Sequence, residues 1–584
     1  MRYYLKQRLA HIAHTMDIIR RVILALIFWG IVLLLLITVL GNRPPSVKPD
    51  SLLVLNPLGT LVDAYTSPVS YRGVPVGGYL NETLLDDLIT ALDMASSDPR
   101  ISGLWINLSN MSGGGTAAVG ELADAVKRFG ESGKNIISSA DTYDNARYRI
   151  ASSSDYILVD RIGEVFPSGY GSFRAYYAEG LEKYGVKAEL FRSGESKTGA
   201  ENYILDGMSE AARRDETRLL TDLWDSWLND VAANRGVDTE YLSEWINNYD
   251  KYLLDAGGDG SKSALDAGLV DLVETGGVLK ELLDAQFGTD ESRRIDAVDY
   301  VSGQFHQRGK DGTIAVIPIT GVLVYGEGAA GNAGSSDVVQ TITTARETHG
   351  VKAVVLRINS PGGDVRAGEE IRRVLEETRK QWNLPVVVSM GNLAASGGYW
   401  IAAESDLILT RPETITGSIG VYSMSLSFEE ALSRWLGVHI DGIGTTPWAG
   451  STNPGRSLDE RTASLYASSV RDIDGMFRSL VAEKRGLSAE EVDKLAGGIP
   501  WSGSRAIESG LADISGGLKE AEESAAGLAG LDEWNTIYFE KMENPGEKML
   551  GKLLWGKHSI RGATSKSFRW QTSILPRLRR TNSP

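Results

Sequence analysis

The chain contains no cysteine, and this absence excludes several classes of protein. Disulfide bonds, catalysis by a thiolate and zinc sites built on thiolates all need this residue. Histidine is also scarce, with 6 residues among 584. Positive charge is in deficit, because 60 Lys and Arg face 76 Asp and Glu and leave a net charge of -16. Since a nucleic-acid surface needs a basic footprint, we expect no nucleic-acid partner.

One long apolar run is present, over residues 22–40. Its 19 residues carry no charge. As a helix they would span roughly 28 Å, close to the hydrocarbon thickness of a bilayer. The sequence therefore predicts a transmembrane signal anchor, with an N-terminal segment at 1–21 before it and a linker at 41–50 after it.

Basic residues precede this run and predict its orientation. They are Arg2, Lys6, Arg8, Arg20 and Arg21. The positive-inside rule keeps such a segment in the cytoplasm and places the rest of the chain across the membrane. A cleaved signal peptide is the alternative, but the run exceeds the usual length of its apolar region and no A-x-A site follows.

Three segments recur in the same order in the two halves of the chain. The matches pair 51–62 with 313–324, 101–115 with 351–365, and 144–159 with 395–410. Each half alternates apolar strands with helical stretches, which is typical of α/β units with mostly parallel sheets. We therefore predict two tandem copies, at 51–300 and 311–530. The strands expected in the first copy are 51–56, 102–108, 135–139 and 156–159, and the helices expected are 119–129 and, in the second copy, 366–381.

Helix-forming stretches at 208–300 and 457–530 are interpreted as helical arms or caps of the two copies. Their amphipathic spacing predicts one apolar face on each, made by Leu220, Leu223 and Trp227 or by Val470, Ile473 and Phe477. We interpret both faces as packing surfaces.

The C-terminal tail, at 548–584, has nine Lys and Arg and no acidic residue. Such a charge run predicts a flexible, solvated segment. Contact of this basic tail with anionic lipid headgroups is the alternative interpretation.

A candidate nucleophile lies in the second copy, where the strand at 385–391 runs into a turn of small residues around Ser396. A strand, a tight turn and a helix start would expose this hydroxyl at a helix N-terminus. The glycines of an earlier turn, Gly362 and Gly363, would let backbone N–H groups stabilise a tetrahedral oxyanion. Close packing of a helix on a strand is the alternative use of the small residues around Ser396, and an ordinary structural turn is the alternative use of Gly362 and Gly363. The first copy lacks both features, and Asn145 falls on Ser396.

A serine nucleophile also needs a base. His349 precedes a predicted strand and His439 is predicted to lie within one, so both suit ordinary core or surface roles. Lysine can serve instead if its pKa falls from about 10.4 to near 7. Lys197 lies in a segment whose second-copy counterpart carries Ala449 at or next to this position. Each copy keeps one partner and lacks the other, which predicts one composite site at the interface between the copies.

The anchor, the two copies and three motifs resemble the signal peptide peptidase A (protease IV) family in its long, duplicated form. The motifs are INSPGG at 358–363, AASGGYWIA at 394–402 and TGSIGVYS at 416–423. The first is also similar to a turn of the Clp protease proteolytic subunit and of the wider crotonase-like fold. The resemblance implies an α/β fold of tandem duplicated crotonase/ClpP-like domains with helical arms, preceded by one transmembrane helix.

The resemblance also implies the roles of individual residues. Ser396 would be the nucleophile and Lys197 the general base, with Ser418 lining the site. The N–H groups of Gly397 and of Gly363 or Gly362 would form the oxyanion hole. No metal or cofactor is implied.

The implied activity is that of a serine endopeptidase that hydrolyses remnant signal peptides and other apolar peptides through an acyl-enzyme. The enzyme would be a homo-oligomer, a tetramer by resemblance, held in the bacterial inner membrane by 22–40 with its catalytic part on the periplasmic side. A crotonase-type acyl-CoA enzyme and a non-catalytic membrane scaffold are the alternative functions. The sequence leaves open whether the Ser–Lys pair forms within one chain or between chains.

Overall fold

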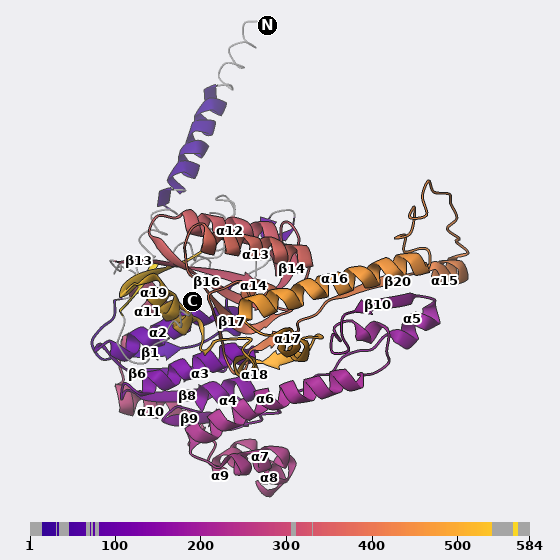
Figure 1. The fold of residues 1–584 in the computed structure, drawn as a ribbon. Coiled ribbons are helices and arrows are strands. Elements are labelled where there is room, and N and C mark those ends of the chain that lie inside the picture. Colours follow the sequence, from indigo (N-terminus) through magenta and orange to yellow (C-terminus); the bar gives the residue numbers. More distant parts are fainter. Residues whose placement is uncertain are drawn as a thin grey trace, which may run out of the picture.

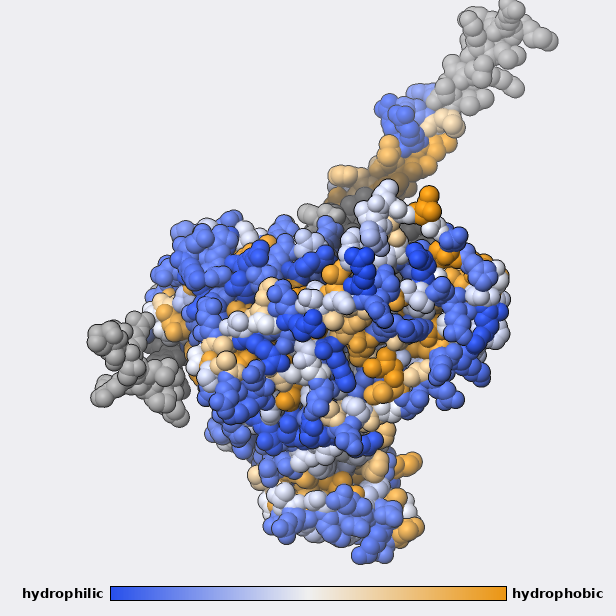
Figure 2. All heavy atoms as spheres, turned by 45° about the vertical axis from the view of Figure 1, so that its right-hand side comes forward, coloured by the Kyte–Doolittle hydropathy of each residue, from blue (hydrophilic) through white to orange (hydrophobic). Residues whose placement is uncertain are grey.

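The computed structural model describes residues 14–30, 32–33, 46–65, 70–71, 74–75, 81–304, 311–329, 331–539 and 565–569. Residues 14–30 and 32–33 are helical and project from the body of the protein (Figure 1). The outer part of this projection is hydrophilic and the part nearer the body is hydrophobic (Figure 2). No helix of the described ranges is both long and apolar enough to cross a membrane. Residues 31 and 34–40 of the predicted anchor lie outside the described residues.

The first copy is built on a six-stranded sheet with the order β11-β9-β8-β6-β1-β12. Every neighbouring pair in this order is parallel. The strands that the sequence predicts begin and end within one residue of the observed bounds. The observed strands are β1 (Ser51–Leu55), β6 (Ile101–Asn107), β8 (Asn135–Ala140), β9 (Tyr156–Asp160), β11 (Leu272–Glu274) and β12 (Arg294–Asp296).

The second copy repeats this strand order as β22-β18-β17-β16-β13-β23, again with parallel neighbours. Three more strands extend its sheet to nine, because β19 pairs with β17, β21 with β19, and β24 with β23. The bounds are β13 (Gly312–Thr320), β16 (Val351–Ser360), β17 (Val386–Ala395), β18 (Leu407–Thr410), β19 (Ile415–Gly417), β21 (Pro500–Ser502), β22 (Ile514–Ser515), β23 (Glu533–Tyr538) and β24 (Ser565–Arg569). The last strand falls within the predicted flexible tail, whose other residues lie outside the described ones.

Helices cover both faces of each sheet (Figure 1). In the first copy they include α2 (Leu85–Ser97), α3 (Thr116–Gly130), α4 (Asn145–Ala151), α10 (Val278–Phe287) and α11 (Ala297–Gln304). In the second copy they include α12 (Ser335–Glu347), α13 (Val365–Lys380), α14 (Gly397–Ala402), α17 (Ala489–Leu495), α18 (Gly503–Glu508) and α19 (Leu518–Ala529).

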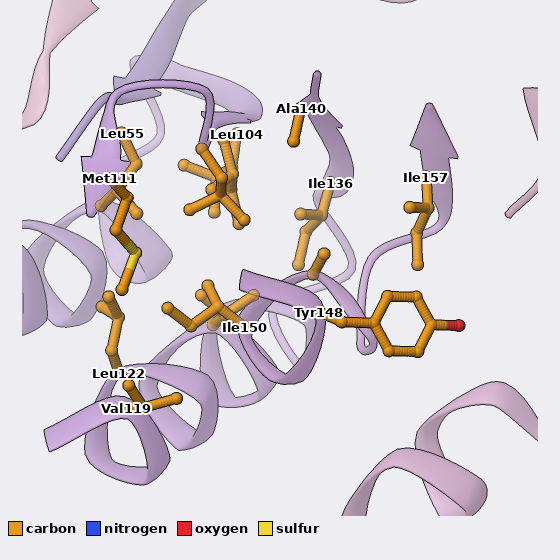
Figure 3. Packing of buried hydrophobic residues seen from close by; sticks show 14 of the residues in the cluster. Leu55, Leu104, Met111, Val119, Leu122, Ile136, Ala140, Tyr148, Ile150 and Ile157 are labelled. Atoms are coloured by element: carbon orange, nitrogen blue, oxygen red, sulfur yellow. The ribbon is translucent and has the colours of Figure 1, made fainter. Parts of the chain in front are cut away.

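Apolar side chains on successive strand residues enter two separate clusters, because adjacent residues of a strand point to opposite faces. Ile136 packs in a large cluster and its neighbour Ile137 in a smaller one with Leu283 of α10. In Figure 3, Ile150 of α4 and Leu122 of α3 lie against the large-cluster face of the sheet. This core sets the position of the α4 N-terminus, which is the first-copy counterpart of the candidate nucleophile turn.

Two buried tyrosines at equivalent positions make the same hydrogen bond in the two copies. Tyr148 of α4 donates a hydrogen bond from its hydroxyl to the carbonyl of Leu269 at 2.7 Å. Tyr399 of α14 donates in the same way to the carbonyl of Leu511 at 2.8 Å. These tyrosines also match in the sequence alignment, so the two copies share a fold and a packing scheme.

The predicted arms are long helices, α6 (Glu210–Arg235) and α16 (Glu460–Arg485), of 26 residues each. Trp227 of α6 and Phe477 of α16 are buried, as the amphipathic spacing predicts. Shorter helices α7 (Thr239–Asn247), α8 (Tyr249–Asp255) and α9 (Gly260–Asp266) follow α6.

A small sheet joins the two copies. Strand β10 (Lys187–Arg192) of the first copy pairs antiparallel with β20 (Tyr422–Ser427) of the second, over six residues each. The two strands belong to halves that are separate in sequence, so their pairing fixes the relative position of the segments that follow β10 and precede β20.

A buried ionic cluster also joins the copies. Arg357 of β16 contacts Asp63 at 2.8 Å and Glu121 of α3 at 2.7 Å. All three side chains are nearly excluded from solvent. Removal of one partner from such a cluster leaves an uncompensated buried charge, which is strongly destabilising.

One predicted strand is absent from the second copy. Residues 437–444, which include His439, form no strand, so the prediction for this segment is wrong. The physical reason is that its side chains are exposed and no sheet or core supports an extended conformation there. His349 does precede a strand, β16, as expected.

Candidate functional site

Ser396 lies at the junction between β17 and α14, as the turn sequence predicts. Its backbone has a φ of 54° and a ψ of -118°, which are unfavourable values for a residue with a side chain. The N–H of Ser396 holds this conformation by donating to the carbonyl of Gly417 at 2.8 Å. Ser418, the residue after this carbonyl, also has a positive φ, of 49°. Such strain persists where surrounding structure enforces it, often at functional sites.

Lys197 lies in the loop that follows β10, and this loop is held against the second copy. Ser193 donates from its N–H to the carbonyl of Val421 at 2.9 Å, and its side-chain Oγ accepts from the N–H of Val421 at 2.8 Å. Gly498 passes so close that a Cβ atom on it would lie 2.5 Å from the Cα of Lys197. The lysine of the first copy is therefore positioned by backbone contacts with the second.

The structure brings Lys197 and Ser396 together within one chain. The lysine Nζ lies 3.0 Å from the Ser396 Oγ, and it also contacts the carbonyl oxygen of Ser418 at 2.8 Å and the Ser418 Oγ at 3.1 Å. Only 5% of Lys197 is exposed. Burial lowers the pKa of Lys197 from 10.5 to about 8, against an opposing effect of the Asp474 carboxylate. A substantial fraction of this amine is neutral near pH 8 and can accept a proton.

The glycine turn lies directly beside Ser396. A Cβ atom on Gly362 would lie 2.5 Å from the backbone nitrogen of Gly397 and 2.8 Å from the Ser396 Cβ. The N–H of Gly362 donates to the Ser360 Oγ at 3.2 Å. For the N–H groups of Gly363 and Gly397, no acceptor is found among the described residues. These two N–H groups are the available donors next to the serine hydroxyl.

Lys197, Ser396 and Ser418 open into a cavity of about 900 Å³ that both copies line. Part of its wall is apolar and consists of Val322, Val365, Trp400, Val421, Met424 and Phe477. The rings of Trp400 and Phe477 pack with their centroids 4.8 Å apart. Phe477 packs in the core of the second copy, as predicted, and it also lines the cavity together with Leu220, which the sequence did not predict. Sequence periodicity marks a buried face but does not distinguish a core from a cavity wall.

The counterpart positions carry different side chains with different partners. Asn145, at the start of α4, donates through its side chain to the carbonyl of Gly169 at 2.7 Å. The guanidinium of Arg147 donates to the carbonyl of Met111, in the turn that matches the glycine turn of the second copy. Ala449 lies in an exposed segment. The first copy therefore fills its own turn with an arginine side chain.

Several residues around the site were not predicted from sequence. The carboxylate of Asp474 in α16 raises the pKa of Lys197, and Gly498 has no side chain to block the close approach of the lysine loop. Glu216 of α6 lines the cavity. The Gly-Gly pair at 497–498 is the only sequence signal among them, since a glycine pair permits close backbone approach. Within the described ranges, no group of three or more His, Cys, Asp or Glu is placed to hold a metal ion.

Comparison with known proteins gives the family. The model of Peptidase family S49 matches residues 128–284 and 378–532, one range in each half of the chain. The chain belongs to peptidase family S49. It is a serine peptidase, and its resemblance to protease IV is confirmed.

Three relatives extend this likeness over most of the chain. Protease 4 of Salmonella typhi is 36% identical over 465 residues, which cover 79% of this chain and 74% of that protein. Protease 4 of Haemophilus influenzae is 31% identical over 524 residues, which cover 87% of this chain and 85% of that protein. The chloroplastic serine protease SPPA of Arabidopsis thaliana is 27% identical over 452 residues, which cover 73% of this chain and 63% of that protein. A ClpP1 mutant from Listeria monocytogenes aligns with a TM-score of 0.24 and 16% identity, over 35% of this chain and 93% of that one.

Proposed function

We propose that this S49 peptidase is a membrane-anchored endopeptidase in which Ser396 is the nucleophile and Lys197 the general base. The observation that carries the proposal is the 3.0 Å contact between the lysine Nζ and the serine Oγ. Burial supports the lysine's role, because it lowers the pKa to about 8 and so makes the neutral amine accessible.

In the proposed reaction, neutral Lys197 takes the proton from the Ser396 Oγ as this oxygen attacks a peptide carbonyl carbon. The carbonyl oxygen becomes an oxyanion, which the N–H groups of Gly363 and Gly397 stabilise. The protonated lysine then gives the proton to the leaving amine, and an acyl-enzyme remains on Ser396. Lys197 then takes a proton from water as the water oxygen attacks the acyl carbonyl carbon, and it returns this proton to the departing Ser396 Oγ, which releases the carboxylic acid product.

The proposed substrates are extended apolar peptides, above all remnant signal peptides. The apolar wall of the cavity, with Trp400 and Phe477, suits such chains. Strand β16, which leads into Pro361 and the glycine turn, is paired on both edges with β13 and β17, so the peptide is proposed to lie along the cavity wall beside the turn rather than to extend this sheet. A relative from Enterococcus faecium that is 33% identical over 179 residues bears the name putative signal peptide peptidase SppA. Cleavage should favour small residues at the cut.

Membrane anchoring through residues 22–40 is part of the proposal. The described residues between 22 and 30 are helical and their side chains are exposed, although most of them are apolar. Exposure of this kind needs a nonaqueous environment to be favourable. The basic residues before the segment support the proposal that the catalytic part lies on the periplasmic side of the bacterial inner membrane. Assembly as a homotetramer rests on the family resemblance.

The test is peptidase activity of full-length, detergent-solubilised protein on a quenched-fluorescence peptide of signal-peptide composition. Ser396→Ala and Lys197→Met should each lose at least about 10³-fold in kcat/KM, as expected when a member of a catalytic unit is removed. Lys187→Met removes an exposed lysine of β10 and should retain activity. Full activity in either site variant, with folding intact by circular dichroism, would refute the dyad.

The anchor has its own test. Substitution of two residues near its middle, Val32→Arg and Leu33→Arg, should shift the protein from the carbonate-resistant membrane fraction to the supernatant, because charge is costly at the centre of a bilayer. Equal membrane retention of this variant and the parent would contradict the anchor.

A further inference from the structure

The wall of the cavity has a charged part that takes no role in the proposed reaction. It consists of Arg174, Asp215 and Glu216. Asp215 is engaged within the protein, because its Oδ1 contacts Arg214 at 3.2 Å and Arg218 at 3.5 Å. The neighbouring carboxylate, Glu216, is engaged at only one of its two oxygens.

Glu216 is 8% exposed. Its Oε1 pairs with the guanidinium of Arg174. Its Oε2 is buried and has no hydrogen-bond partner among the described residues. A buried acceptor without a donor is unfavourable. Because Glu216 lines the cavity, a turn of its carboxylate would bring Oε2 to a donor that arrives with a ligand.

The chemistry of that donor follows from the charge already present. Arg174 balances the negative charge of Glu216, so a second cation is not required for neutrality. A neutral donor satisfies the remaining oxygen, and peptides carry such donors as side-chain hydroxyls and carboxamides. The terminal torsion of a glutamate is broad, so the carboxylate can turn toward a ligand without leaving the arginine.

We propose that Glu216 forms a polar subsite that selects a hydroxyl- or carboxamide-bearing residue at one position of an otherwise apolar peptide. The inference rests on the proposed function, because the donor has to arrive on a peptide that occupies the cavity. A site built around a buried acceptor discriminates strongly against a substrate that lacks the donor, since the acceptor is then left unpaired. An apolar wall alone would bind threonine and valine peptides almost equally.

The test measures binding rather than cleavage, on full-length Ser396→Ala protein in detergent, by anisotropy of fluorescein-labelled peptides. A series of apolar peptides carries threonine at one position at a time, and each has a valine twin of nearly the same shape. At one position the threonine peptide should bind about tenfold more tightly than its twin. Adding Glu216→Met to this protein should reduce the ratio to about one by tightening the valine peptide as well as weakening the threonine peptide.

The matched control is Asp225→Asn, which removes one exposed carboxylate from the same helix. It should retain the tenfold ratio. The inference is overturned if no position shows a ratio above twofold, if Glu216→Met leaves the ratio unchanged, or if a lysine peptide binds more tightly than the threonine peptide. Since these variants do not cleave, the result is independent of the dyad. If the wild-type enzyme cleaves peptides but no threonine peptide binds more tightly than its valine twin, only the subsite is refuted. If the threonine preference is observed but the wild-type enzyme does not cleave, only the proposed reaction is refuted.

Discussion

The Nζ of Lys197 lies 3.0 Å from the Oγ of Ser396 although the two residues are 199 positions apart in the chain. The lysine follows β10, and β10 is paired with β20 of the other copy. The contact between the two side chains thus depends on pairing between strands from different halves of a duplicated chain.

The acid side of the pH profile should report the pKa of Lys197. Because the amine has to be neutral, kcat/KM is expected to rise with pH through a midpoint near the pKa of about 8. The Asp474 carboxylate raises this pKa, so Asp474→Asn should move the midpoint to lower pH. Asp493→Asn is the control, because Asp493 pairs with the same Arg478 but is largely exposed. An unchanged midpoint in Asp474→Asn would contradict this electrostatic coupling.

Burial of Lys197 should cost stability at neutral pH. The pKa of this lysine is about 8 in the folded chain against 10.5 for the free group, so the unfolded chain binds more protons between these values. The free energy of unfolding should therefore rise as pH increases from about 8 to 10.5. Lys197→Met should stabilise the protein by about 1–3 kcal/mol at pH 7, with the gain fading toward pH 10.5.

The measurement for Lys197→Met is urea unfolding at a series of pH values, with the exposed Lys187→Met as control. A variant that is destabilised at pH 7, or whose gain does not depend on pH, would show that the lysine contributes through its contacts rather than through its buried charge.

The glycine turn should tolerate no side chain. Gly362→Ala places a Cβ atom 2.5 Å from the Gly397 nitrogen at a φ of 92°, so we expect kcat to fall by about 10²-fold or more as the oxyanion donors move apart. Gly326→Ala imposes a similar backbone cost at a φ of 84° but meets no atom within 4 Å. Peptidase activity and thermal unfolding should be measured for both variants. If Gly326→Ala loses as much kcat as Gly362→Ala, the loss of activity comes from backbone strain alone.

The ionic cluster between the copies should matter more than a surface pair. Arg357→Met leaves Asp63 and Glu121 buried without their partner, and we expect a loss of about 3–5 kcal/mol in urea unfolding. Arg366→Met breaks the pair with Asp364, in which the arginine side chain is 72% exposed, and should cost less than about 1 kcal/mol. A cost for Arg357→Met as small as that of the surface variant would mean that solvent reaches the cluster.

Much of the fold follows from the sequence because it depends on local pattern. The strand that begins at Ser51 and the helix over α13 are visible in apolar runs and periodicity, and the duplication makes each copy a check on the other. The strand prediction is wrong around His439, because this exposed segment does not pair with any strand of a sheet. Periodicity records which residues avoid water and says nothing about the surface that covers them.

The candidate site could be predicted only in part, for a related reason. Ser396 and Lys197 stand out because each is missing from the opposite copy. Asp474 and Glu216 carry no such signal, since their relation to the site exists only after α16 and α6 have packed beside it. Sequence alone does not separate an acidic residue on a solvated helix face from one that faces a cavity.

The pairing of β10 with β20 has a consequence for the order of events during synthesis. If Lys197 and Ser396 act as proposed, a nascent chain that has emerged only as far as the first copy holds the base without the nucleophile, and the second copy alone holds the nucleophile without the base. Hydrolytic power would then arise late, once the whole polypeptide has left the ribosome and closed on itself.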